Sequence, residues 1–166
     1  MKRGIIAIVS LLVLTVTAGA ETSERAGRIA LGFQSLGGFP PAVDLRIWLS
    51  DRLAVQPAIG LTISNNDETV TNLNVGGRVL YTLRSTKQVD YHLAGDIGIR
   101  IQDNAETLTD VGLRAMVGPE FFLAPHLSFQ TDVGVGLWLY DSDGLDRTDF
   151  GTFGDLFGSL ALHYYF

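Results

Sequence analysis

Three groups of residues in the sequence have side chains and spacings that suggest chemistry. A histidine two residues before a serine could form a nucleophilic pair, two further histidines could bind a metal, and closely spaced aspartates could bind calcium. The groups are His126 with Ser128, His92 with His163, and Asp141 with Asp143 and Asp146. Each lacks partners that its chemistry needs, so the sequence predicts no catalytic residue, no cofactor and no metal site.

The two candidate metal sites fail on the number of ligands. His92 and His163 fall on expected strands that are not neighbours, and two histidines without a third fixed ligand do not make a zinc site. The aspartates around Gly144 lack the third ligand before the glycine and the glutamate six residues after it that an EF-hand loop requires. The plain interpretation is two hydrogen-bonded histidines and one solvated acidic loop.

Length and composition limit the classes of protein that need to be considered. The 166 residues fit one domain, and 46% apolar with 18% charged residues argue against a disordered chain. Eighteen acidic against twelve basic residues give a net charge of −6, which argues against binding to nucleic acid. The absence of cysteine excludes a disulfide framework and a thiolate metal site.

Residues 1–20 have the pattern of a secretory signal peptide. Lys2 and Arg3 form a positive start, an apolar run follows, and Ala18-Gly19-Ala20 supplies the small residues of a cleavage site. The apolar run is shorter than the ~20 residues of a membrane-spanning helix, which favours cleavage before Glu21 over an uncleaved anchor. The mature domain is then residues 21–166, with ten basic and eighteen acidic residues and a net charge of −8, because only Lys2 and Arg3 are lost from the charged set.

Beyond residue 27 the apolar residues recur at every second position. In residues 127–140 one set of alternate positions is apolar apart from a threonine, and the other set is polar, glycine or aromatic. Such alternation predicts strands with one apolar face and one polar or small face. It is found in eight stretches: 27–35, 42–50, 53–64, 72–84, 89–102, 110–123, 127–140 and 153–166.

The lengths of strands and connections point to a barrel that crosses a membrane. Several stretches have 12 to 14 residues, more than the ~5–6 typical of soluble sheets and enough for the roughly 9–11 of a tilted membrane strand. Tight turns (50–52, 85–88 and 124–126) alternate with longer polar loops (36–41, 65–71, 103–109 and 141–152). The predicted fold is all-β: an eight-stranded antiparallel up-and-down transmembrane β-barrel.

Charge assigns the two faces of these strands. The apolar positions hold no charged residue at the strand centres, so in a membrane the polar positions must face inward. An unpaired charge inside the barrel costs several kcal/mol, so the guanidinium groups there must pair with carboxylates. A soluble barrel would reverse the two faces, and periodicity alone leaves both arrangements open. Small inward residues could leave narrow water-filled cavities. The predicted interior polar network is Asp44, Arg46, Arg78, Asp96, Arg100, Arg114, Glu120 and Asp132, and the other inward polar residues are Arg28, Gln56, Asp90, His92 and His163.

The C-terminus decides in favour of the membrane. Leu160, Leu162, Tyr164 and Phe166 share one face and the last residue is aromatic, which resembles the terminal-strand signature that the insertion machinery of bacterial outer membranes reads. With the eight strands and the alternating connections, the whole mature chain resembles the small eight-stranded OmpA- or OmpX-type transmembrane barrels. The resemblance implies a Gram-negative-type outer membrane, periplasmic termini and a monomer, with membrane lipid, lipopolysaccharide and the insertion machinery as partners. Because no periplasmic domain of the OmpA kind is expected after Phe166, it does not extend to a wall-tethering role.

Within this barrel the sequence His126-Leu127-Ser128 resembles the His-x-Ser of lipid A deacylase barrels, whose pair lies on the lipid face beside an acidic partner. Here His126 is expected in a periplasmic turn and Ser128 on the polar face, and no glutamate follows in the next strand at a useful depth. The departure favours a plain turn residue over an enzyme acting on lipids.

Aromatic and proline residues add two structural expectations. Six aromatic residues on the apolar positions lie beside tight turns or the C-terminus, as an aromatic girdle at one membrane boundary requires. Pro57 and Pro119 fall inside strands and remove ladder donors, which predicts local bulges there and a possible change of parity at Phe121 and Phe122. The girdle residues are Tyr81, Tyr91, Phe121, Phe129, Tyr164 and Phe166.

The leading functional hypothesis is a non-enzymatic outer-membrane protein with a role in envelope integrity or in surface recognition through its outer loops. The acidic loops suggest a further hypothesis, in which divalent cations bridge them to lipopolysaccharide phosphates. The main alternative is a narrow, porin-like pore or small-solute channel lined by the inward Arg and Asp residues. A lipid-modifying enzyme and a soluble periplasmic ligand-binding barrel are the remaining possibilities.

Overall fold

The computed structural model describes residues 25–35, 41–65, 69–103, 107–142, 145–152 and 158–166. These residues form ten β-strands: β1 (Ile29–Ser35), β2 (Ala42–Trp48), β3 (Leu53–Asn65), β4 (Thr69–Ser85), β5 (Val89–Asp103), β6 (Thr107–Ala124), β7 (Leu127–Thr131), β8 (Val133–Ser142), β9 (Leu145–Thr152) and β10 (Leu160–Tyr165). No helix in this part of the chain is long and apolar enough to cross a membrane. The predicted signal peptide lies outside the described residues.

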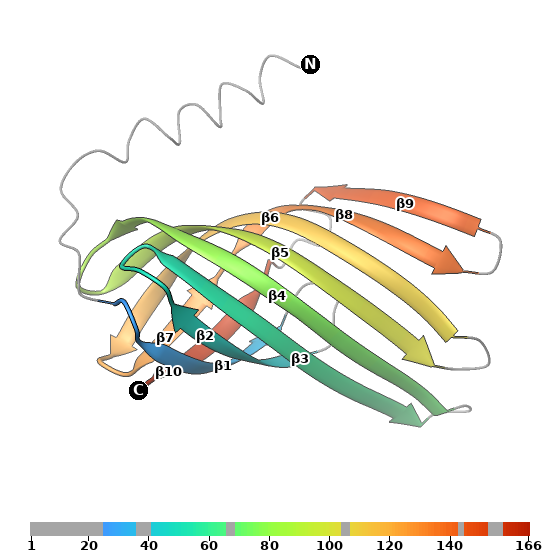
Figure 1. Ribbon diagram of the computed structural model, residues 1–166, viewed down its shortest axis with the longest axis horizontal. Helices are drawn as coiled ribbons and strands as arrows, with labels where there is room; N and C mark the ends of the chain where they lie inside the picture. The colour runs from blue at the N-terminus through green and yellow to red at the C-terminus, as the bar shows by residue number, and fades with distance from the viewer. Residues whose placement is uncertain (1–24, 36–40, 66–68, 104–106, 143–144, 153–157) are drawn as a thin grey trace, which may run out of the picture.

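The ten strands make a closed antiparallel barrel of eight strands (Figure 1). The seventh barrel strand consists of β7 and β8, which are interrupted only at Asp132, and the eighth consists of β9 and β10. Each barrel strand pairs with the one before it, and β10 returns to pair with β1 from Ala30–Tyr165 to Ser35–Leu160. The predicted all-β, eight-stranded up-and-down fold is confirmed.

Side chains alternate between the two faces of this barrel, as the pleat of a β-strand demands. On β1, β2 and β10 every second residue is buried and those between are exposed or half-exposed. The buried positions hold charged residues such as Arg46, Arg78 and Glu120, whereas large apolar residues are exposed on the outside, with Ile59 at 58% and Leu61 at 61%. A small apolar cluster also lies inside: Ala30, Trp48, Ala54, Leu80, Ala94, Met116 and Tyr165, with Phe122 packed against it.

Tight connections lie at one end of the barrel, which we call the short-turn end. It holds the turns at residues 49–52, 86–88 and 125–126, together with the segment before β1 and the C-terminus. Backbone bonds link the two chain ends to it: the Gly27 N–H donates to the Trp48 carbonyl (2.9 Å), and the Tyr165 N–H donates to the His126 carbonyl (2.8 Å).

The expected bulges at Pro57 and Pro119 are absent. Pro57 lies opposite Gly77 and Pro119 opposite Tyr91, both in continuous register. On the side of β3 that faces β2, and on the side of β6 that faces β7 and β8, the proline and one neighbour are unpaired, but the pairing resumes in the same register. The missing N–H therefore costs a ladder hydrogen bond and does not insert a residue. The register shifts lie near the short turns instead, at Thr82/Arg84 and Phe122/Ala124.

The strands also extend further toward the long connections than predicted. β4 begins at Thr69 and β6 at Thr107, and most of the expected loop 141–152 forms the end of β8 and the strand β9. Threonine is common in strands, so these polar segments continue the ladder without apolar alternation. Of the expected strand 153–166, residues 153–157 are not described, and β10 starts at Leu160.

Candidate functional site

The first cluster in the barrel interior is built around Arg46 of β2, which has no exposed surface. Its Nη1 donates to Glu120 Oε2 at 2.7 Å and to the Tyr165 hydroxyl at 2.9 Å. Its Nε and Nη2 both donate to Gln56 Oε1 at 3.0 Å, and Nη2 also bonds Gln130. One guanidinium therefore joins β2, β3, β6, β7 and β10 across the barrel.

Glu120 of β6 is the counter-charge of Arg46 and is itself fully satisfied. Its Oε1 accepts the Tyr165 hydroxyl at 2.8 Å and the Ser128 hydroxyl. Charge-assisted bonds of this kind are the strong ones, and they offset the cost of burying both ions.

The second cluster is built around Arg78 of β4. Its Nε and Nη2 bind the two oxygens of Asp96 at 2.7 and 2.9 Å, a bidentate pair, and its Nη1 donates to Asp132 Oδ2 at 2.9 Å. Asp132 also accepts the Ser159 hydroxyl at 2.5 Å and the Gln130 amide at 2.7 Å. Since Gln130 contacts Arg46 and Asp132, it links the two clusters.

Both interior histidines are paired with an aspartate. His92 Nε2 lies 2.6 Å from Asp132 Oδ1, and His163 Nε2 lies 3.2 Å from Asp44 Oδ1. The two histidines thus occupy separate pairs, and the described residues contain no group of three or more His, Asp or Glu side chains that could hold a metal ion.

All eight residues of the predicted interior network lie on the inner face, but their partners differ from a simple pairing of the named set. Arg46 meets Glu120, Arg78 meets Asp96 and Asp132, and Arg114 Nη2 lies 3.1 Å from Asp96. Asp44 faces His163 rather than an arginine, and Arg100 pairs with Asp110 through an Nε–Oδ2 bond of 2.7 Å.

Several interior partners were not named by sequence reasoning, among them Arg25, Asp110, Gln130, Ser159 and Tyr165. Asp110 and Gln130 have the inward parity of their predicted strands, and Tyr165 has the parity opposite to Phe166. Parity could therefore have found these three, and also Ser159, which shares the parity of Tyr165 within the predicted strand 153–166. Arg25 precedes the first alternating stretch.

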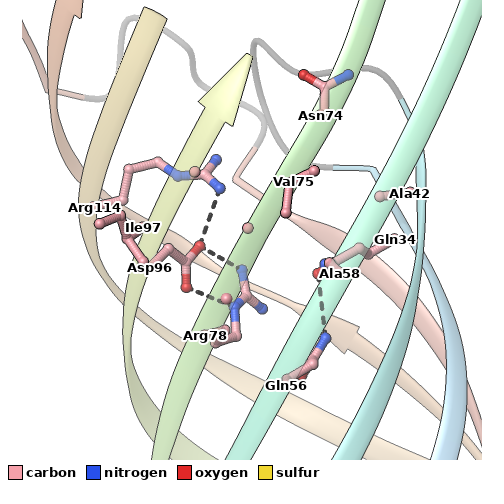
Figure 2. Close-up of a pocket in the computed structure, with 13 residues that line it drawn as sticks. Gln34, Ala42, Gln56, Ala58, Asn74, Val75, Arg78, Asp96, Ile97 and Arg114 are labelled. Carbon is pink, nitrogen blue, oxygen red and sulfur yellow. Dashed lines mark hydrogen bonds and ion pairs between the residues drawn. The ribbon is translucent and has the colours of Figure 1, made fainter. Parts of the chain in front are cut away.

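A small cavity lies beside the second cluster (Figure 2). Its volume is about 20 Å³, enough for about one water molecule. Asn74, Arg78, Asp96 and Arg114 line it from β4, β5 and β6, and Gln34 and Gln56 lie on the other side joined by a 3.3 Å bond. The small residues Ala58, Gly76 and Gly98 also line it.

Asn74 predicts an occupant for this cavity. The residue is 6% exposed, and neither its Oδ1 nor its Nδ2 has a hydrogen-bond partner among the described residues. Because an unsatisfied buried amide costs about 1–3 kcal/mol, we expect an ordered water bonded to it. A crystal structure at high resolution tests this by showing density within hydrogen-bond distance of either Asn74 atom; an empty cavity contradicts it.

The pair His126 and Ser128 does not form a nucleophilic site. His126 Nδ1 lies 3.0 Å from the Tyr165 carbonyl, and its ring stacks on Tyr164 with centroids 6.0 Å apart. Ser128 is fully buried and donates to Glu120. The His126 ring thus lies beside the outward-facing Tyr164, whereas the Ser128 side chain lies inside the barrel.

The outer face carries the residues of the expected aromatic girdle and of the C-terminal signature. Tyr81, Tyr91, Phe121, Tyr164 and Phe166 are exposed near the short-turn end, and Phe129 is half-buried beside Phe121. Leu160 and Leu162 continue the same outward row on β10. The side chains of the acidic loop residues Asp141, Asp143 and Asp146 lie outside the described part of the chain.

Asp51 in the turn between β2 and β3 carries a pH-dependent contact. Its carboxylate accepts the backbone N–H groups of Arg25 (2.9 Å) and Ala26 (3.4 Å), and these bonds lower its pKa below the usual 3.8. Because the pKa is lower in the folded protein, the contact contributes its full stability when the pH is above the usual pKa. This stability is lost as the pH falls through the lowered pKa of the folded protein. A carboxyl titration by NMR should give a midpoint below 3.8, and Asp51→Asn should speed amide exchange at Arg25 and Ala26; unchanged exchange would contradict the contact.

Comparison with known proteins supports the fold. No protein-family model and no curated protein matches the sequence. Among solved structures, the chain is similar to the N-terminal β-barrel domain of Pseudomonas aeruginosa OprF, with a TM-score of 0.50 and 7% identity over 87% of this chain and 100% of that one. It also matches Ail, the attachment invasion locus protein of Yersinia pestis, with a TM-score of 0.42 and 12% identity over 85% of this chain and 99% of that one.

Proposed function

We propose that the chain is an integral outer-membrane protein without enzymatic activity, which serves envelope integrity or surface recognition through its outer loops. Its fold is that of the small eight-stranded outer-membrane β-barrels, as its sequence predicted. The observation that carries the proposal is the inversion of its faces. Arg46 and Glu120 are buried, whereas leucine, isoleucine and valine side chains cover the outside.

The height of the apolar outer face fits a membrane. On β5 the outward apolar side chains run from Tyr91 to Ile101. Ten residues at ~3.4 Å each, tilted by ~45°, rise about 24 Å, close to the ~25 Å apolar band of outer-membrane barrels. The aromatic residues at the short-turn end then lie at one interface, which is the periplasmic one if both chain ends are periplasmic.

The interior supports a structural role over the narrow pore or small-solute channel. Five interior residues that contact one another across the barrel are each less than 2% exposed. They are Arg46, Gln56, Glu120, Gln130 and His163. The cavity beside Gln56 and Arg78 has a volume of about 20 Å³, room for about one water molecule. We therefore assign recognition to the outer loops, which would lie next to lipopolysaccharide. Divalent cations are the proposed bridge between the acidic side chains of these loops and the lipopolysaccharide phosphates.

Fractionation and gel mobility test the proposal together. We expect the full chain expressed in a Gram-negative host to be processed before Glu21, to stay with outer membranes after a urea wash and to migrate differently in SDS before and after boiling. Recovery from the soluble periplasm without a heat-shifted band would overturn the membrane assignment. Steady single-channel currents of the purified barrel in planar bilayers would instead favour the pore.

A further inference from the structure

We propose that residues 25–28, here called the N-terminal arm, are a stopper that closes the short-turn mouth of the barrel, with Arg25 as its anchor. Arg25 precedes the first strand, yet its side chain lies inside the barrel and is only 4% exposed. Its Nη2 donates to Ser85 Oγ at 2.5 Å and to Asp90 Oδ1 at 2.7 Å, and its Nη1 forms an ion pair with the same carboxylate.

Two aromatic rings complete the binding site of this guanidinium. The Arg25 Cζ lies 5.1 Å from the ring centroid of Trp48 and 5.8 Å from that of Phe122. Both distances are within the ~6 Å range of cation–π attraction, which strengthens when the cation is desolvated. The four partners come from β2, β4, β5 and β6, so the side chain reaches across the mouth instead of lying along one wall.

The backbone of the arm is folded to deliver this side chain. The Arg28 N–H donates to the Arg25 carbonyl at 2.9 Å, closing a four-residue turn, and Gly27 has a φ of 83°. A positive φ at the third position is the mark of a type II turn and suits glycine. Further bonds fasten the turn to the barrel: Gly27 N–H to the Trp48 carbonyl, and Arg25 N–H to Asp51 Oδ1 at 2.9 Å.

Charge at the mouth explains why the anchor is an arginine. Asp90 is 1% exposed, and Arg25 is the cation that binds it. A buried carboxylate needs a partner, and the planar guanidinium can bind it through two nitrogens, which a lysine ammonium cannot. The arm thus closes the short-turn end through hydrogen bonds and an ion pair that are separate from those of Arg46 and Arg78. This closure goes beyond what the proposed function requires.

The chain contains no cysteine, so a single introduced thiol can report access through the mouth. Thr82 lies on the inner face just inside Ser85 and is 3% exposed. We expect a polar maleimide to label Thr82→Cys about tenfold faster when Arg25→Ala is added to the folded barrel in detergent, because local opening then needs less free energy. Arg52→Ala is the matched control, since Arg52 is an exposed arginine of the adjacent turn, and it should leave the rate unchanged.

A second thiol separates opening of the mouth from loosening of the whole barrel. Ala58 lines the central cavity, beyond the mouth, and Ala58→Cys should react at the same rate with and without Arg25. Equal labelling of Thr82→Cys in both backgrounds would overturn the proposal. So would faster labelling at both thiols, because Arg25 would then be a general stabilising residue. Loss of membrane association by the unmodified chain would instead contradict the proposed function and leave the labelling result intact.

Discussion

Replacing Arg46 with methionine is expected to lower the free energy of unfolding by about 3–5 kcal/mol. The substitution removes the guanidinium that donates to Glu120, Tyr165 and Gln56. Methionine fills much of the same volume but offers no donor, so Glu120 is left buried with its charge uncompensated. Desolvation of that carboxylate, rather than lost packing, accounts for most of the expected effect.

Urea titration of the barrel in detergent micelles measures this loss, with the folded fraction read from the heat-shifted band and from tryptophan fluorescence. Arg52→Met is the matched control because Arg52 is exposed in a turn. The double variant Arg46→Met with Glu120→Met removes both charges and should recover a large part of the lost stability. An Arg46→Met midpoint equal to that of Arg52→Met would contradict the importance of this ion pair.

The alternation of residues was sufficient to predict which side chains face inward. Successive side chains of a strand point to opposite faces, so parity alone placed Arg46, Arg78 and Glu120 inside. It could not predict which of them meet. Arg46 and Glu120 are 74 positions apart in the chain and lie on non-adjacent strands, so their contact depends on the stagger of the closed barrel, a property that no single strand carries.

The prolines show a second limit of sequence reasoning. A missing N–H at Pro57 or Pro119 was expected to insert a bulge, but a barrel strand has two neighbours and can lose a bond on one side while the other side keeps the register. The shifts at Thr82/Arg84 and Phe122/Ala124 occur beside turns, where strand pairs end. The change of parity considered at Phe121 and Phe122 lies next to the second shift, whereas no residue pattern pointed to the first.

Arg25 lay beyond the reach of the same reasoning for another reason. It precedes the first alternating stretch, so parity assigns it no face. Its place inside the barrel results from the turn at residues 25–28 and from partners on four strands that only closure brings together. Polar residues next to the ends of barrel strands therefore need to be judged from the closed structure.

Gly118 is a position at which the addition of one methyl group should have a large effect. A Cβ atom added there would lie 1.9 Å from the Thr131 carbonyl oxygen and 2.5 Å from Asp132 Oδ1. The first atom is backbone, so the wall between β6 and β7 must move, and with it the carboxylate that binds Arg78 and His92. Overpacking of this kind costs about 1–3 kcal/mol, and the disturbed ion pairs place Gly118→Ala at about 3 kcal/mol or above.

Gly95 provides the matched control. It lies on the neighbouring strand β5, and a Cβ atom added there meets nothing within 4 Å. Gly95→Ala should therefore change the free energy of unfolding by no more than about 0.5 kcal/mol. The urea midpoints of the two variants, measured in the same micelles, should differ clearly, with Gly118→Ala the lower. Equal midpoints would mean that β6 and β7 can separate at Asp132 without cost, which the shared hydrogen bonds of that carboxylate argue against.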